Sequence, residues 1–191
     1  MLQKIYNPKS TSYLNFKKYC IGDQITWQWY ENNCQPSNDQ KGINFGFFAH
    51  LFLIPPWPRA LYSTPVDERT LEVHDIIRGI LEYNRIKVDI IYRIAVQFTT
   101  PIEDEGHSVE HVDHSFPHKN LIVYLTDPEG GSTVCEGEEF LGKEDDAIIF
   151  EGEHYMYPPK RGRRMVIIAT YSGETIKSVS YTHLTLPTRY R

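Results

Sequence analysis

From residue 87 onward the chain is a series of short apolar stretches separated by turns, and this pattern constrains the fold more than any other feature. The first stretch alternates apolar with polar residues, as a strand with one buried face does. The residues expected on its buried face are Val88, Ile90, Tyr92, Ile94, Val96 and Phe98. Further strands are expected at Leu121–Thr126, Ser132–Cys135, Ala147–Phe150 and Met165–Tyr171. Many short strands rich in Val, Ile and Tyr indicate a mainly β fold, either a barrel or a jelly roll.

One helical pattern precedes these strands. Apolar residues recur at helical spacing from Val73 to Leu81, with charged residues on the opposite side. Thr64 and Pro65 resemble a helix N-cap followed by proline at the first helical position. We therefore predict a helix over residues 65–84 that braces the barrel. Residues 1–60 are irregular and aromatic, and within them residues 25–30 alternate like a short strand.

The size and charge of the chain argue against several classes of protein. One domain is expected for 191 residues. The formal net charge of −5 argues against a dedicated nucleic-acid or membrane-surface binder. No apolar run approaches the ~18–20 residues that cross a bilayer, and the first residues lack the apolar core of a secretion signal. The three cysteines form no Cys-x-x-Cys pair, so a cytoplasmic protein without a zinc ribbon or disulfide scaffold is expected.

The last residues of the chain look foreign to the rest. The segment Val179–Thr188 resembles a translated sequencing-library adapter. We therefore expect residues 178–191 to be non-native and the native domain to span residues 1–177. A genuine disordered tail is the alternative, and under either interpretation this segment contributes no chemistry.

Two histidines and an aspartate form the most informative polar pattern. His111 and Asp113 are two residues apart, so on a strand both side chains would point to one face. His154 follows the expected strand Ala147–Phe150 and would supply a third ligand from another part of the barrel. Two imidazoles and one carboxylate are the ligand set of the Fe(II) oxygenases. A zinc site that uses His111 and His114, or a polar loop without metal, are the alternatives.

A basic segment, Lys160–Arg164, comes shortly after His154. It can be interpreted as a solvated turn or as a basic interaction patch. Arg164, however, opens the expected strand Met165–Tyr171, so its side chain can reach inward at the mouth of the barrel. A buried arginine without a carboxylate partner would be costly, and its burial would therefore imply an acidic ligand. The other basic side chains of this segment are expected to stay in solvent.

Taken together, these motifs resemble the 2-oxoglutarate/Fe(II)-dependent dioxygenase superfamily, in particular its prolyl-hydroxylase-like and bacteriophage-type branch. The resemblance covers roughly residues 87–172. The matching segments are Tyr92–Phe98, His111-x-Asp113, Asn120–Thr126, Gly130-Gly131, Ala147–Phe150, His154 and Gly162–Arg164. The set is fairly specific in combination, although His-x-Asp alone is a weak signal.

The resemblance implies a fold and a metal site. The fold would be a double-stranded β-helix, which is a jelly-roll or cupin-like barrel, with supporting helices at the N-terminal side. In this family His111, Asp113 and His154 would bind Fe(II). The family reaction couples oxidative decarboxylation of 2-oxoglutarate by O2 to hydroxylation of a second substrate, and it releases succinate and CO2. The second substrate, whether peptidyl or a small molecule, is not readable from the sequence.

The resemblance also implies a cosubstrate site. Arg164 would pair with the distal carboxylate of 2-oxoglutarate, and Tyr124 stands where relatives place a hydroxyl on the same carboxylate. Gln97 stands where phage-type relatives carry a pocket-facing Asn. A core tyrosine and a plain strand residue are the alternatives for Tyr124 and Gln97. For the whole chain, the alternative is a non-catalytic or zinc-binding jelly-roll protein with a structural metal site.

Overall fold

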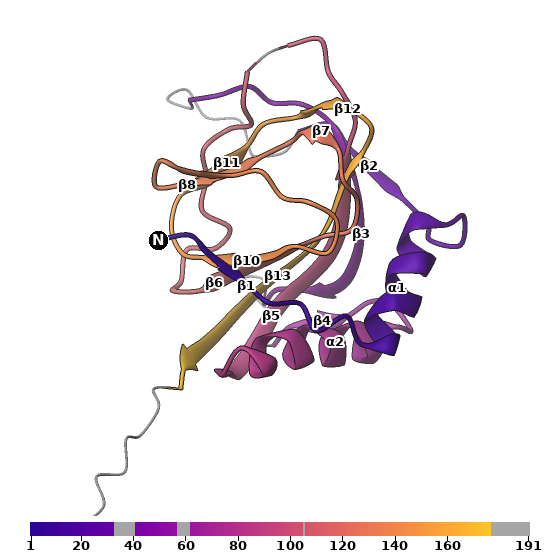
Figure 1. Cartoon of the computed structure of the whole chain (residues 1–191), viewed down its shortest axis with the longest axis vertical. Helices are drawn as coiled ribbons and strands as arrows, with labels where there is room; N and C mark the ends of the chain where they lie inside the picture. Colours follow the sequence, from indigo (N-terminus) through magenta and orange to yellow (C-terminus); the bar gives the residue numbers. More distant parts are fainter. Residues whose placement is uncertain (33–40, 57–61, 105, 177–191) are drawn as a thin grey trace, which may run out of the picture.

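The computed structural model describes residues 1–32, 41–56, 62–104 and 106–176 (Figure 1), so the tail expected to be non-native lies outside the described residues. The helices of this part are α1 (Thr11–Ile21) and α2 (Thr70–Tyr83). The strands are β1 (Gln3–Ile5), β2 (Gln28–Tyr30), β3 (Phe47–Ile54), β4 (Thr64–Pro65), β5 (Ile86–Thr99), β6 (Lys119–Tyr124), β7 (Glu129–Gly130), β8 (Thr133–Cys135), β9 (Glu138–Phe140), β10 (Ala147–Phe150), β11 (His154–Met156), β12 (Pro159–Arg161) and β13 (Arg164–Thr175).

The strands form one large sheet and two small ones. The large sheet has the order β1-β10-β6-β13-β5-β3-β2, and β4 pairs with β3 at its side. The small sheets, β11-β8-β9 and β12-β7, lie across from the large one, and together they enclose an interior (Figure 1). The mainly β, jelly-roll prediction is therefore confirmed, with the two helices as its supports.

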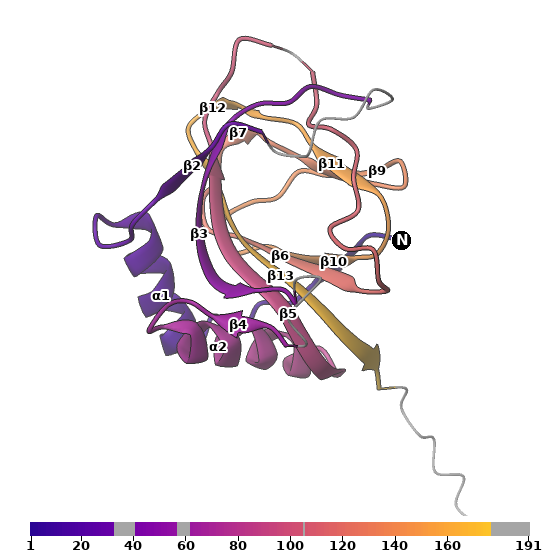
Figure 2. The same cartoon turned by 180° about the vertical axis from the view of Figure 1, so that it is seen from behind.

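Both helices lie on the outer face of the large sheet, away from the small sheets (Figure 2). The apolar residues of α2 join those of β3, β5 and β13 in the main hydrophobic core. The helix α1 went unpredicted, although Ser10 caps it by accepting a hydrogen bond from the Tyr13 backbone N–H. Its buried residues Tyr13, Phe16 and Cys20 follow helical spacing. None of the described helices is both long and apolar enough to span a bilayer.

The predicted start of the second helix was wrong. Thr64 and Pro65 form β4, which pairs with Leu53 and Ile54 at the end of β3. The helix begins five residues later than predicted, at Thr70, whose hydroxyl donates to the carbonyl oxygen of Asp67. A Thr-Pro pair suits a short edge strand as well as a helix start, because proline lacks an N–H to donate in either place.

The expected faces of the first long strand were correct only in part. The register between β5 and β13 shifts after the pair Arg93–Thr170, because Tyr171 then pairs with Ile91. Such a bulge exchanges the two faces of a strand, since successive side chains alternate. Ile90, expected to be buried, is 53% exposed, whereas Ile91 is 5% exposed.

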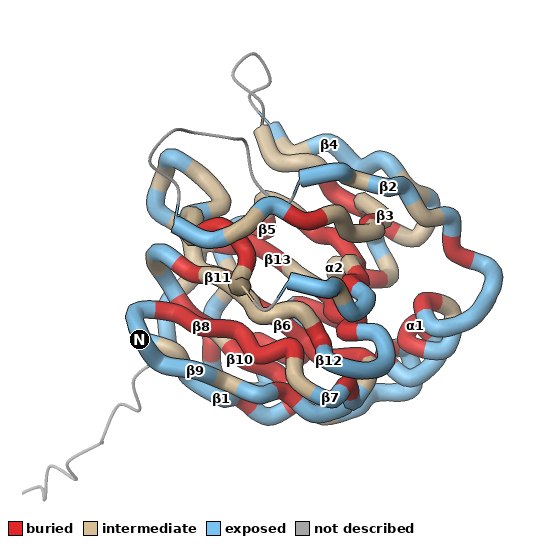
Figure 3. Tube along the Cα trace, turned by 90° about the horizontal axis from the view of Figure 1, so that it is seen from above, coloured by how far each residue is buried: buried red, intermediate tan, exposed pale blue. Residues whose placement is uncertain are grey.

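A second apolar cluster lies between the inner face of the large sheet and β8. It consists of Ile122, Tyr124, Cys135, Ile148, Phe150 and Val166. Figure 3 shows that burial follows β6, β8 and β10, while the turns at the surface are exposed. The inner face therefore combines a packed apolar floor with the polar residues of the site described next.

Candidate metal centre and cavity

His111 and Asp113 lie in the loop between β5 and β6, not on a strand as predicted. The loop is nevertheless held firmly, because His111 and His154 exchange backbone N–H···O hydrogen bonds, both 3.0 Å long. Ser108 adds a second attachment, since its backbone N–H donates to Met156. The loop that carries the two ligands is therefore held by hydrogen bonds to both ends of β11, and it does not form a strand of the large sheet.

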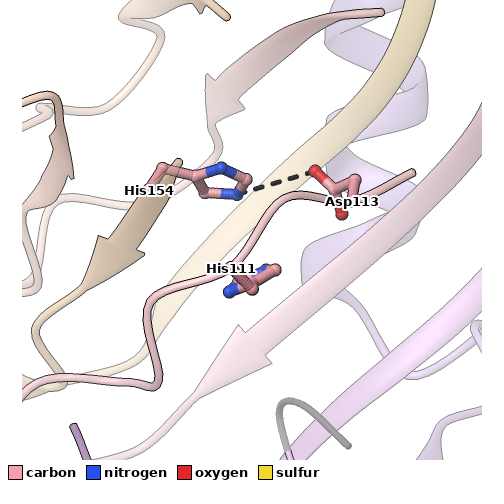
Figure 4. Close-up of side chains that lie close together, drawn as sticks. All are labelled: His111, Asp113 and His154. Atoms are coloured by element: carbon pink, nitrogen blue, oxygen red, sulfur yellow. Dashed lines mark ion pairs between the residues drawn. The ribbon is translucent and has the colours of Figure 1, made fainter. Parts of the chain in front are cut away.

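The three side chains converge in space (Figure 4). One ligand atom from each of His111, Asp113 and His154 lies within 4.8 Å of the others. The Nε2 of His154 lies 3.5 Å from Oδ2 of Asp113, and the two imidazole centroids are 4.6 Å apart. Among the described residues, no other group of three or more His, Cys, Asp or Glu side chains is arranged in this way.

Backbone carbonyls fix the tautomers of the two imidazoles. Nδ1 of His111 lies 2.9 Å from the carbonyl oxygen of Val109, and Nδ1 of His154 lies 3.2 Å from that of Gly152. A carbonyl oxygen only accepts, so each Nδ1 carries the proton. In the neutral imidazole this tautomer leaves Nε2 with the lone pair that a metal ligand requires.

The charges of the group suit a metal ion. Burial alone would raise the pKa of Asp113, but Arg93 at 2.8 Å and the facing imidazoles hold this pKa well below its usual range. Burial lowers the pKa of His154 to about 4, although Asp113 opposes the shift. The buried Oδ2 of Asp113 has no hydrogen-bond partner in the described part of the chain. A carboxylate oxygen that faces two imidazole nitrogens fits a divalent cation.

A cavity of about 370 Å³ extends from this group into the barrel. Arg164 lines it and is only 3% exposed. Its guanidinium donates to the carbonyl oxygen of Gly131 and the hydroxyl of Thr133, each at 2.8 Å, and contacts the sulfur of Met156 at 3.5 Å. No carboxylate pairs with Arg164 among the described residues. By contrast, Lys160, Arg161 and Arg163 are exposed.

Of the two further predicted cosubstrate residues, Gln97 lies at the cavity wall and Tyr124 lies behind it. Gln97 lines it directly. Tyr124 is fully buried in the second apolar cluster, and its hydroxyl makes a 2.7 Å hydrogen bond with the hydroxyl of Thr133. Thr133 also accepts from Arg164, and the Arg164 guanidinium lies over the Tyr124 ring at 5.3 Å, so the hydroxyl of the tyrosine is connected to the cavity through Thr133 and its ring supports Arg164.

Sequence reasoning missed Arg93, Asn120 and Thr133, which all line the cavity. Arg93 had a usable signal, because it shares the polar side of its strand with Gln97. The pairing of His111 with His114 in a zinc site was wrong, since His114 instead bonds the hydroxyl of Thr170 at 2.7 Å.

The chain is similar to known proteins in its structure and not detectably in its sequence. No family model matches the chain, and no curated protein matches it. A 2OG-Fe(II) oxygenase family oxidoreductase from Burkholderia pseudomallei aligns with a TM-score of 0.65 at 11% identity, over 92% of this chain and 87% of that one. A prolyl hydroxylase from Trichoplax adhaerens, in complex with a hypoxia inducible factor peptide, aligns with a TM-score of 0.51 at 13% identity, over 89% and 82%. The chain therefore has the fold of the 2OG-Fe(II) oxygenases, and the resemblance found in the sequence is confirmed for the fold.

Proposed function

We propose that this chain is an Fe(II)- and 2-oxoglutarate-dependent dioxygenase that hydroxylates a second substrate and releases succinate and CO2. The observation that carries the proposal is one cavity on this fold that combines two functions. It joins two imidazole Nε2 atoms and a carboxylate oxygen without a hydrogen-bond partner in the described residues with a buried guanidinium that no described carboxylate balances.

The metal would be held by Nε2 of His111, Nε2 of His154 and the carboxylate of Asp113. Bound iron supplies the activation of O2 and the oxidation of substrate. The protein supplies oriented ligands, because the Val109 and Gly152 carbonyls accept from Nδ1 and leave each Nε2 available to the metal.

The distal carboxylate of 2-oxoglutarate would bind Arg164. The Gly131 carbonyl and the Thr133 hydroxyl orient the guanidinium but leave its charge uncompensated. A buried cation oriented by neutral acceptors favours an anionic ligand, and the planar fork suits a carboxylate. Gln97 would contact the cosubstrate from the neighbouring strand β5, and Tyr124 would hold Thr133 in place.

Apolar side chains would keep water away from the reacting groups. Phe45, Phe47 and Phe150 line the cavity together with Ile122 and Ile168. Exclusion of water strengthens every charged contact inside. The second substrate would be peptidyl or a small molecule, and the peptide-bound prolyl hydroxylase of the same fold is the reason to include peptides.

The experiment is anaerobic loading with Fe(II), followed by admission of O2 and a succinate-release assay over a panel of peptides and small molecules. We expect succinate only when iron, 2-oxoglutarate and O2 are all present, with the largest yield when a true substrate is added. Tight zinc binding without any oxygen-dependent use of 2-oxoglutarate would instead support the structural-metal alternative.

A further inference from the structure

A row of polar side chains crosses the inner face of the large sheet beside the metal ligands. Arg93 of β5 pairs with Thr170 of β13, and Thr170 pairs with Asn120 of β6. Neighbouring strands lie about 4.8 Å apart, so the backbones of Arg93 and Asn120 are about 10 Å apart. Both side chains line the cavity. Asn120 also pairs with Phe150, whose ring centroid lies 4.8 Å from that of His154. At the other end of the row, Arg93 contacts Asp113, so both ends of the row lie beside metal ligands.

The hydrogen bonds of this row are incomplete. The Thr170 hydroxyl is bonded to His114, and one guanidinium nitrogen of Arg93 lies 2.8 Å from Asp113. The Nε of Arg93 has no partner, and neither amide atom of the fully buried Asn120 has one, among the described residues. Unpaired buried donors are costly, so two on one cavity wall indicate that a polar ligand group completes them.

The charges on the cavity wall point to the sign of that group. Arg93 and Arg164 are cations, and Asp113 is the single carboxylate that lines the cavity in the described residues. One positive charge is left over. A bound Fe(II) ion and a doubly charged 2-oxoglutarate cancel each other, so the loaded cavity keeps the same excess. A singly charged anion would balance it, whereas a phosphate dianion would exceed it.

We propose that Arg93 and Asn120 form a subsite for a carboxylate group of the primary substrate. This inference rests on the proposed function and specifies its substrate class. The Nε of Arg93 and the amide of Asn120 supply donors from two sides, while Ile122, Phe150 and Ile168 supply an apolar floor between and beyond them. The substrate is accordingly an apolar or aromatic carboxylic acid, either free or as a carboxyl group of a peptide.

The test compares two probes of the same shape, benzoate and benzamide. Each is titrated by calorimetry into the full chain loaded anaerobically with Fe(II) and 2-oxoglutarate. The visible charge-transfer absorbance of the iron–cosubstrate complex is followed in parallel, to confirm that the probe does not displace 2-oxoglutarate. We expect benzoate to bind at least roughly tenfold more tightly than benzamide, because its contact with a guanidinium is charge-assisted. Peptides that end in a free phenylalanine carboxylate, compared with the same peptides as C-terminal amides, then separate a peptidyl source from the small-molecule one.

Three variants test whether Arg93 and Asn120 form the subsite, and a fourth serves as a control. Arg93→Gln should bring the benzoate-to-benzamide ratio close to one, and Arg93→Lys should keep part of it, because lysine retains charge but not the fork. Asn120→Leu touches no metal ligand and should reduce the ratio several-fold, so it decides the matter if Arg93→Gln weakens the metal site. Arg161→Gln changes an exposed side chain at the end of β12 and should leave the ratio unchanged.

Two outcomes overturn the inference in distinguishable ways. If the charge-transfer absorbance forms but benzoate and benzamide bind equally, or the ratio survives both Arg93→Gln and Asn120→Leu, the subsite is refuted and Arg93 serves only Asp113. If the absorbance never forms in the unaltered protein, the proposed function itself fails and the subsite falls with it.

Discussion

The two arginines of the cavity lie at different ends of the same sheet face and are balanced in different ways. Arg164 begins β13, and Arg93 pairs with Thr170 roughly 20 Å further along that strand. Arg164 contacts only neutral acceptors, whereas Arg93 pairs with the Asp113 carboxylate. The role of a buried arginine therefore depends on its partner. The charge of Arg164 remains available for a ligand. The charge of Arg93 mainly keeps the metal ligand Asp113 anionic.

Removing Asp113 would break this comparison most severely, because both arginines would then lack a carboxylate. We expect Asp113→Ala to reduce Fe(II) affinity by more than the roughly 10–100-fold that loss of a ligand's supporting partner costs. Anaerobic metal titration measures it. The matched control is Asp127→Ala, which removes an exposed carboxylate outside the cavity and should leave Fe(II) affinity unchanged.

The same titration applies to the imidazoles. His111→Ala and His154→Ala should each weaken Fe(II) binding to a similar extent, because each removes one ligand atom. His114→Ala is the control, since its imidazole bonds Thr170 instead of facing the group. Unchanged metal affinity in all three ligand variants would refute the site.

Arg164→Ala tests the other side of the comparison. It removes the free cation and should raise the apparent dissociation constant of 2-oxoglutarate by roughly 10–150-fold, as expected for a charge-assisted contact. Fe(II) affinity should stay nearly constant, because Arg164 contacts no metal ligand. Titration of the iron-loaded protein with 2-oxoglutarate under anaerobic conditions measures both. Arg164→Lys should rescue only in part, and Arg163→Ala, on the exposed turn, should have little effect.

The contrast between these arginines also marks what the sequence could predict. Strand periodicity gave the β-rich fold, and Arg164 was identifiable because it opens a strand shortly after His154. For Arg93 the sequence offered only its place beside Gln97 on the polar side of a strand, because its contact with Asp113 depends on the pairing of β5 with β13 and on a distant loop. Local patterns carry no information on which strands become neighbours. For the same reason the bulge that turns Ile90 toward solvent was not predicted.

Thr133→Val would sharpen the comparison by altering what orients Arg164 without touching its charge. The valine cannot accept from the guanidinium or bond the Tyr124 hydroxyl. We expect the 2-oxoglutarate constant to rise roughly 2–10-fold, as for the loss of one buried hydrogen bond, with iron affinity unchanged. Thr133→Ser keeps the hydroxyl and should bind 2-oxoglutarate almost as the unaltered protein does. Equal losses in both variants would mean that packing, not the hydrogen bond, matters here.

The smallest effect is expected for Tyr124→Phe, which separates the two interpretations of this tyrosine. Its hydroxyl bonds Thr133 and does not itself line the cavity. If Tyr124 acts only through Thr133, the threonine still accepts from Arg164 in the variant, so the 2-oxoglutarate constant should change by less than roughly threefold. The folded protein should lose about 1 kcal/mol of stability from the missing buried hydrogen bond, measured by denaturant unfolding. A rise in the 2-oxoglutarate constant as large as that of Thr133→Val would instead show that the tyrosine hydroxyl contacts the cosubstrate, and that Thr133 moves aside when the cosubstrate binds.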